Sequence, residues 1–392
     1  MELVQNHKKL CTHCGQCLDV CPMYEDLGLI ERLYAFLETG VGIEPEDLSS
    51  CLTCGLCAEA CPEGLGLKRL ISPARKKLVA EMGLGTRQTM VDPAADNNIF
   101  KKILEMGGLS KVPEYKSGPA PVVYFPGCAA NYINTSMSKA TVALLEEAGV
   151  DYSVLSGLEY CCGAVSAGAG NPGPLQRNAK KNLDELKRRG AKILVTACPG
   201  CFKAFKDIYP RVFGAPDFEV LQISQYLERL IQERKLILRH PLKHRVFYHD
   251  PCHLTRGLGV YREARAVLEA VPGTELANKS PEGSACCGFG GGVRASAPDK
   301  SLAIASGRHK AAKALGCDLI ITNCGGCMQN LTEAGAESEE ELEVVDLAEY
   351  LARAFGKNIK REDRKMLEEV NKAYSLCLQN YILPDKASNN YL

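Results

Sequence analysis

The sequence has 392 residues, in which 47 Lys and Arg balance 47 Asp and Glu, and 46% of the residues are hydrophobic. This composition is typical of a globular chain, excludes extensive disorder and allows two or three domains. With zero net charge the chain has no polybasic field for phosphate backbones, so nucleic acid is not expected as a partner.

The apolar stretches, such as residues 121–125 and 319–322, are far shorter than the ~20 residues that cross a bilayer. The first residues lack the basic and then apolar layout of a signal peptide. We therefore expect no membrane span and a cytoplasmic location, where thiols stay reduced. In a long cytoplasmic chain, 20 cysteines indicate metal or redox chemistry rather than a disulfide scaffold.

Two runs near the N-terminus have the same cysteine spacing, C-x2-C-x2-C-x3-C-P. The first run ends at Pro22 and the second at Pro62. This is the bacterial [4Fe–4S] pattern, in which the fourth cysteine of each run binds the cluster of the other run. The expected ligand sets are Cys11, Cys14, Cys17 and Cys61 for one cubane cluster, and Cys51, Cys54, Cys57 and Cys21 for the other.

Zinc is the alternative for these eight cysteines, because it also takes four thiolates with C-x2-C spacing. Between the runs, residues 26–40 carry apolar side chains at helical spacing, which predicts a helix that stops at Gly40. The insert is similar to the all-helical ferredoxin module of respiratory iron–sulfur subunits. We expect this module to span residues 1–82 and to carry single electrons, followed by a linker over residues 83–120.

The rest of the chain is an internal duplication. PVVYFPGC, YCCG and ILVTACPGC return as RVFYHDPC, ACCG and LIITNCGGC, and the matching cysteines lie 124 to 126 residues apart. Each copy alternates strands and helices, which predicts a parallel sheet covered by helices. The expected α/β domains span residues 121–238 and 239–356, and a partly amphipathic tail covers residues 357–392, in which a helix is expected near residues 367–383.

In each copy, the first cysteine and the C-x2-C pair directly follow strands, so they should meet at the carboxyl edge of one sheet. The five cysteines per copy exceed the four corners of a cubane, which indicates an unusual cluster. The alternatives are a redox disulfide at the vicinal pair, a zinc site, or a thioredoxin-like dithiol. The two sets are Cys128, Cys161, Cys162, Cys198 and Cys201 in the first copy, and Cys252, Cys286, Cys287, Cys324 and Cys327 in the second.

This repeated pattern resembles the CCG (cysteine-rich) domain of heterodisulfide reductases, and the whole layout resembles the D-type subunit of those enzymes. Iron–sulfur subunits of glycolate oxidase and anaerobic glycerol-3-phosphate dehydrogenase are also similar. The resemblance implies a noncubane [4Fe–4S] cluster on each complete set of five cysteines, with the two clusters on either side of a disulfide substrate. It further implies that the cubanes supply single electrons, that an iron of each noncubane cluster captures one sulfur, and that two thiols leave after protonation.

The resemblance also implies a cytochrome b-type membrane subunit or a flavoprotein as partner, and a position on the cytoplasmic membrane face through that partner. The alternative function is an electron relay that serves a flavin-dependent glycolate, lactate or glycerol 3-phosphate dehydrogenase and passes electrons to quinone. The complete cysteine sets favour disulfide reduction. No dinucleotide fingerprint or P-loop is present, so flavin and NAD are not expected on this chain.

Several other residues are candidates for roles around these cysteines. His249 and His253 flank Cys252 and are candidates to protonate a leaving thiolate, His253 in particular, or to hydrogen-bond the loop. The Gly-rich run before Arg294 could bind a substrate anion or pack tightly around a cluster. Cys317 and Cys377 lie outside every motif, and we expect ordinary thiols there.

Overall fold

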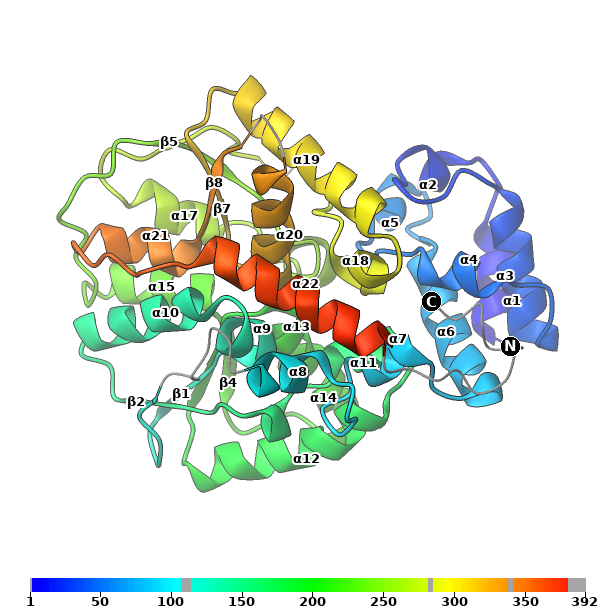
Figure 1. Cartoon of the computed structure of the whole chain (residues 1–392), viewed down its shortest axis with the longest axis horizontal. Helices are drawn as coiled ribbons and strands as arrows, with labels where there is room; N and C mark the ends of the chain where they lie inside the picture. Colours follow the sequence, from blue (N-terminus) through cyan, green and yellow to red (C-terminus); the bar gives the residue numbers. More distant parts are fainter. Residues whose placement is uncertain (1, 107–113, 281–284, 338–340, 380–392) are drawn as a thin grey trace.

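The computed structural model describes residues 2–106, 114–280, 285–337 and 341–379 (Figure 1). Within these ranges no helix is long and apolar enough to cross a membrane. The described chain forms a helical N-terminal module and two parallel sheets, which confirms the predicted fold class.

Helices are the only regular secondary structure in the described N-terminal module, as predicted. The expected helix over residues 26–40 is α3, and it ends just before Gly40. Its Leu33 packs in a buried core with Leu70 of α6, and several of the cysteines border this core. The helices are α1 (Glu2–Leu10), α2 (Gln16–Asp19), α3 (Gly28–Thr39), α4 (Pro45–Ser49), α5 (Leu56–Ala60) and α6 (Lys68–Met82).

The first α/β copy is built on a parallel sheet with the strand order β2-β1-β3-β4. Its strands are β1 (Val122–Phe125), β2 (Tyr152–Val154), β3 (Ile193–Thr196) and β4 (Glu219–Gln222). Its helical segments are α9 (Gly127–Tyr132), α10 (Thr135–Glu147), η1 (Leu158–Tyr160), α11 (Ala164–Gly168), α12 (Gly173–Arg188), α13 (Pro199–Lys203), η2 (Ala204–Ile208), α14 (Tyr209–Phe213) and α15 (Ile223–Gln232).

The second copy repeats this plan with the order β6-β5-β7-β8. Its strands are β5 (Arg245–Tyr248), β6 (Glu275–Leu276), β7 (Leu319–Thr322) and β8 (Glu343–Asp346). Its helical segments are α16 (Thr255–Leu258), α17 (Glu263–Glu269), η3 (Gly290–Gly292), α18 (Val293–Ser296), α19 (Pro298–Ala314), α20 (Gly325–Ala336) and α21 (Leu347–Arg353).

The two copies pack on each other through equivalent helices. Helix α10 packs against α21, and α15 packs against α17. Because α10 corresponds to α17 and α15 to α21, the same contact occurs twice, as expected for a pseudo-two-fold relation. One buried apolar cluster runs through both copies and includes Tyr124, Leu144, Tyr248 and Leu351. The copies therefore share a core.

The linker and the tail lie against each other on the surface of the α/β copies. The linker contains α7 (Thr86–Thr89) and α8 (Ile99–Glu105), and the tail forms α22 (Asp363–Gln379), which runs beside α8 in Figure 1. Ile103 of α8 and Val370 and Cys377 of α22 share a buried cluster. The tail thus covers the chain's own apolar surface. Residues 380–383 of the expected tail helix lie outside the described residues.

Candidate functional site

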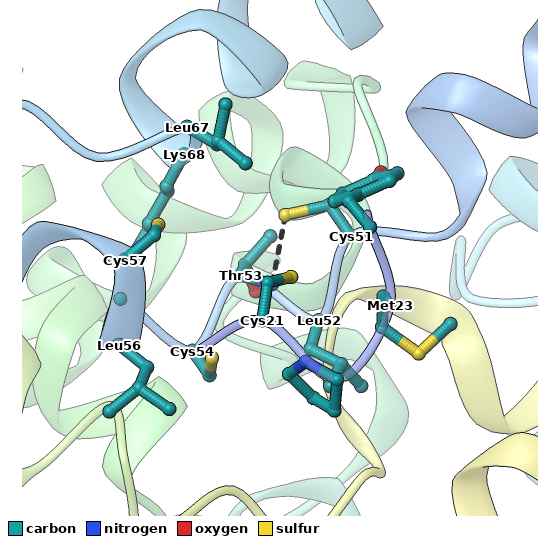
Figure 2. Close-up of a pocket in the computed structure, with 13 residues that line it drawn as sticks. Cys21, Met23, Cys51, Leu52, Thr53, Cys54, Leu56, Cys57, Leu67 and Lys68 are labelled. Carbon is teal, nitrogen blue, oxygen red and sulfur yellow. Dashed lines mark hydrogen bonds between the residues drawn. The ribbon is translucent and has the colours of Figure 1, made fainter. Parts of the chain in front are cut away.

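The second N-terminal run surrounds the last cysteine of the first run. Cys21 lies in one pocket with Cys51, Cys54 and Cys57, as Figure 2 shows. Helices α2 and α5, which follow the two cysteine loops, pack side by side, and this brings the cysteine after α2 to the opposite loop. The structure therefore brings the last cysteine of the first run beside three cysteines of the second run.

Cys17 of the first run has cysteines of both runs as neighbours. Burial, and then the nearby Cys57, Cys11 and Cys61, raise the pKa of the Cys17 thiol to about 11. Cys61, the last cysteine of the second run, is therefore close to the first run. Cys14 is exposed, so this edge of the module faces solvent.

The five cysteines of the first α/β copy form a continuous group. Hydrogen-bond contacts, which perturb the pKa of each thiol, run from Cys128 to Cys161, Cys162, Cys201 and finally Cys198. Cys128 follows β1 and Cys198 follows β3, and these strands are neighbours in the sheet. The predicted meeting at the carboxyl edge of the sheet is therefore observed.

The second copy has the same group in the same order. The contacts run from Cys252 to Cys286, Cys287, Cys327 and Cys324, and they shift the pKa values of the Cys286, Cys287 and Cys327 thiols. In both copies the glycine of the CCG motif has a left-handed backbone. A Cβ at Gly163 would lie 2.3 Å from the Leu175 Cα, and one at Gly288 would lie 2.4 Å from the backbone carbonyl oxygen of Ser301. Glycine is required there because a side chain fits neither the backbone nor the space.

The two groups of five cysteines adjoin each other across the interface of the copies. Gly325, next to Cys324, is so close to Ala129, next to Cys128, that a Cβ on Gly325 would lie 2.4 Å from the Ala129 Cβ. Asn134 Nδ2 also donates a hydrogen bond of 3.0 Å to the Gly325 oxygen. The start of α9 and the start of α20 therefore meet, with a cysteine group on each side.

The chemistry of these donors fits iron–sulfur clusters. All 20 cysteines are free thiols, and 18 of them fall into the four predicted sets. Thiolates are the soft ligands that such clusters and zinc prefer. Metal binding deprotonates thiols even where burial raises their pKa, as it does for Cys21, Cys51 and Cys57.

The N-terminal module adjoins the cysteine group of the second copy. The Cys54 thiol is in hydrogen-bond contact with Cys286, and this contact lowers the pKa of Cys54 to about 6. Arg256 Nε also donates a hydrogen bond of 2.9 Å to the Cys54 carbonyl oxygen. One predicted ligand of a cubane thus touches one predicted ligand of the second α/β site.

Comparisons with known proteins identify the motifs and the layout. The 4Fe-4S dicluster domain matches residues 8–65, and the cysteine-rich CCG domain matches residues 122–206 and 246–332. The D-type subunit of the dihydromethanophenazine:CoB--CoM heterodisulfide reductase of Methanosarcina mazei is 33% identical, over 88% of this chain and 93% of its own. The chain belongs to the family of this heterodisulfide reductase subunit. It is therefore an iron–sulfur oxidoreductase subunit.

Relatives of this heterodisulfide reductase-like chain include proteins with other names. One subunit of the fumarate reductase (CoM/CoB) of Methanothermobacter marburgensis is 30% identical over 90% of this chain and 73% of its own. The EtfAB:quinone oxidoreductase of Syntrophomonas wolfei is 28% identical over 88% of this chain and 46% of its own. Proteins that align with most of this chain are therefore named for different reactions.

In this heterodisulfide reductase-like chain, the Gly-rich run of residues 288–292 packs against the N-terminal module. A Cβ at Gly291 would lie 1.9 Å from the Cys51 oxygen, and one at Gly290 would lie 2.5 Å from the Leu52 oxygen. Arg294 forms a buried ion pair with Glu333, with Nε 3.0 Å from Oε2, and it also donates to Asn371. Of the two interpretations of this run, the structure favours close packing over an anion site.

His253 also faces the N-terminal module. Its Nε2 lies 3.2 Å from the Thr53 carbonyl oxygen and 3.3 Å from Thr53 Oγ1. Burial, together with the charges of Lys68 and Lys203, lowers the pKa of His253 to about 4, so the imidazole is neutral at pH 7. The ring thus joins the loop of Cys252 in the second α/β copy to the loop of Thr53 in the second N-terminal run.

Arg75 was not singled out by the sequence, although it is central to this junction. It is buried and donates hydrogen bonds to the carbonyl oxygens of Leu48, Cys51 and Gly168 at 2.8, 2.8 and 3.1 Å. It therefore ties the second cysteine run to the first α/β copy. An arginine in a charged helical stretch gives no local signal of burial, because its partners are backbone atoms from distant segments.

Proposed function

We propose that this chain is the disulfide-reducing subunit of a complex of the heterodisulfide reductase type. The observation that carries the proposal is the pair of complete five-thiol groups adjoining each other across the α9 and α20 contact. Two adjacent sites suit a substrate with two sulfur atoms. The reaction takes a disulfide, two electrons and two protons to two thiols.

The cysteine sets are assigned as follows. Two cubanes are held by Cys11, Cys14, Cys17 and Cys61, and by Cys21, Cys51, Cys54 and Cys57. Two noncubane [4Fe–4S] clusters are held by Cys128, Cys161, Cys162, Cys198 and Cys201, and by Cys252, Cys286, Cys287, Cys324 and Cys327. When bound, these clusters supply one-electron transfer and a site for sulfur.

Residues of this chain set the route and the environment. The contact between Cys54 and Cys286 makes the second α/β site the entry point for electrons from the N-terminal module. The exposed Cys14 marks the edge at which a donor would meet the module. His253 stays our predicted proton donor. Because its imidazole is neutral at pH 7 in the described structure, that role requires the contact with Thr53 to open and the ring to take up a proton before it donates one.

The partner is proposed to be a cytochrome b-type membrane subunit or a flavoprotein, with the chain on the cytoplasmic side of the membrane. A relay function is the second candidate. Relatives named EtfAB:quinone oxidoreductase and probable iron-sulfur-binding oxidoreductase FadF favour it, because each aligns with about nine tenths of this chain, over 88% and 91% of its length. In a relay, the contact between Cys54 and Cys286 would serve only electron transfer, with no disulfide reduced.

Iron and acid-labile sulfide in protein purified without oxygen test the cofactor assignment. Four [4Fe–4S] clusters require roughly sixteen of each per chain. A reproducible value near eight in folded protein, with or without zinc, would leave two cubanes and a relay.

Disulfide reduction with a low-potential dye as electron donor tests the reaction. The wild-type chain is expected to consume dye when a heterodisulfide of two small thiols is added. Cys128→Ser and Cys252→Ser should each abolish this, whereas Cys317→Ser, which changes a buried thiol outside all four sets, should not. Equal rates in all three variants would contradict the proposal, as would a fully loaded wild-type chain that reduces no disulfide.

A further inference from the structure

His249 is a buried residue that the proposed function does not use. It directly follows β5, and the residue is 2% exposed. Its backbone N–H donates to the Ile321 oxygen at 2.7 Å, and its carbonyl oxygen accepts from Thr322 Oγ1 at 3.1 Å. Both bonds hold it to β7. The ring is therefore positioned by the carboxyl edge of the sheet, beside the second cysteine group.

The imidazole is directed at two thiols of that group. One of its ring nitrogens and the Sγ atoms of Cys287 and Cys327 all lie within 4.8 Å of one another. Nε2 is buried, and in the part of the chain that the structure describes it has no hydrogen-bond partner. A buried nitrogen without a partner costs free energy unless a ligand satisfies it.

The first copy differs at this position. In the aligned stretches, Phe125 occupies the place of His249, and residues 121–238 contain no histidine. Phe125 is buried and packs edge to face on Phe205 with ring centroids 5.1 Å apart. The residue that corresponds to Phe205 in the second copy is Leu331. The first copy therefore places an aromatic pair where the second copy places a nitrogen donor.

We propose that His249 is a sixth protein ligand of the cluster that the second cysteine group would hold (the second CCG centre), and that its imidazole nitrogen would bind an iron there beside Cys287 and Cys327. Neutral imidazole is a good ligand for iron. The inference rests on the second centre holding iron, and it goes beyond the proposed function because it makes the two centres chemically different. The centre next to Cys54 then has five sulfur donors and one nitrogen donor, and the other has sulfur alone.

Pulsed electron paramagnetic resonance of the anaerobic full-length protein tests this ligand. The protein is poised with reductant or oxidant until a CCG signal appears, and a sample of natural isotopic composition is compared with one that contains histidine labelled with the heavy nitrogen isotope. The expected result is a strong nitrogen coupling of the size of a direct iron ligand, which changes with the label. This comparison needs no variant, so it decides the question even if substitution prevents folding.

Two variants locate the nitrogen. His249→Phe, which installs the residue of the first copy, should abolish the coupling. His253→Gln, four residues away, should retain it. Absence of a label-dependent coupling, a coupling as weak as that of a hydrogen-bonded imidazole, persistence in His249→Phe, or zinc in place of iron would each overturn the assignment. Iron, sulfide and disulfide reduction measured on the same wild-type sample separate this failure from failure of the proposed function.

Discussion

The close packing of Gly291 on the second cysteine run predicts that Gly291→Ala will separate the N-terminal module from the second CCG site. Gly291 has a φ of 64°, and an added Cβ would lie 1.9 Å from the Cys51 oxygen. Ordinary contact begins near 3.4 Å. The two loops must therefore move apart by roughly 1.5 Å, since neither atom belongs to a flexible side chain.

Two contributions add to the cost of this substitution. An L-residue in the left-handed region costs about 1–2 kcal/mol, and overpacking of a close contact costs about 1–3 kcal/mol. Gly64→Ala is a matched control, because Gly64 has a φ of 61° and a Cβ there would meet nothing within 4 Å. We expect about 2–5 kcal/mol of destabilisation for Gly291→Ala and about 1–2 kcal/mol for Gly64→Ala.

The assay compares anaerobically prepared, cluster-loaded variants in two ways. Midpoints of denaturation are compared rather than free energies, because a multidomain protein with cofactors does not unfold in two states. The rate at which electrons from the reduced N-terminal module reach the CCG centres is followed by rapid mixing. The loop movement should slow this transfer in Gly291→Ala and leave it unchanged in Gly64→Ala. Equal midpoints and equal rates for the two variants would refute the packing argument.

Three further predictions concern the same junction and the clusters. Arg75→Met leaves the buried carbonyl oxygens of Leu48 and Cys51 without this donor, removes the bond to the Gly168 oxygen and should cost about 2 kcal/mol or more; a denaturation midpoint equal to that of the exposed control Lys76→Met would contradict this. His253→Gln should lower the rate of disulfide reduction about 100-fold if His253 donates a proton, with the iron content unchanged. An unaltered rate would remove His253 from the mechanism. Removal of iron should expose the amides of α2 and α5 to hydrogen exchange while β1 and β3 stay protected, because the short helices depend on bound cysteines; equal protection in both forms would show that the module folds without its clusters.

Much of the fold could be predicted because its signals are local. The cysteine spacing of each run, the helical periodicity of α3 and the duplication from residue 121 onward each depend on neighbours in the sequence. Strands that precede Cys128 and Cys198 also predicted that these thiols meet, because parallel strands end at one edge. The family resemblance drawn from these motifs is confirmed by the comparisons.

The contacts between modules were decided only by the tertiary structure. Cys54 meets Cys286, and Arg75 reaches Gly168, because the N-terminal module docks on the two α/β copies through surfaces that no local pattern describes. The same docking assigns Gly291 to packing and turns His253 toward Thr53. Spacing along the chain determines which cysteines group together, because the loops and strand ends that carry them are defined by a few neighbouring residues. Which groups become neighbours depends on complementary surfaces distant in the sequence, and these form only when the whole chain folds.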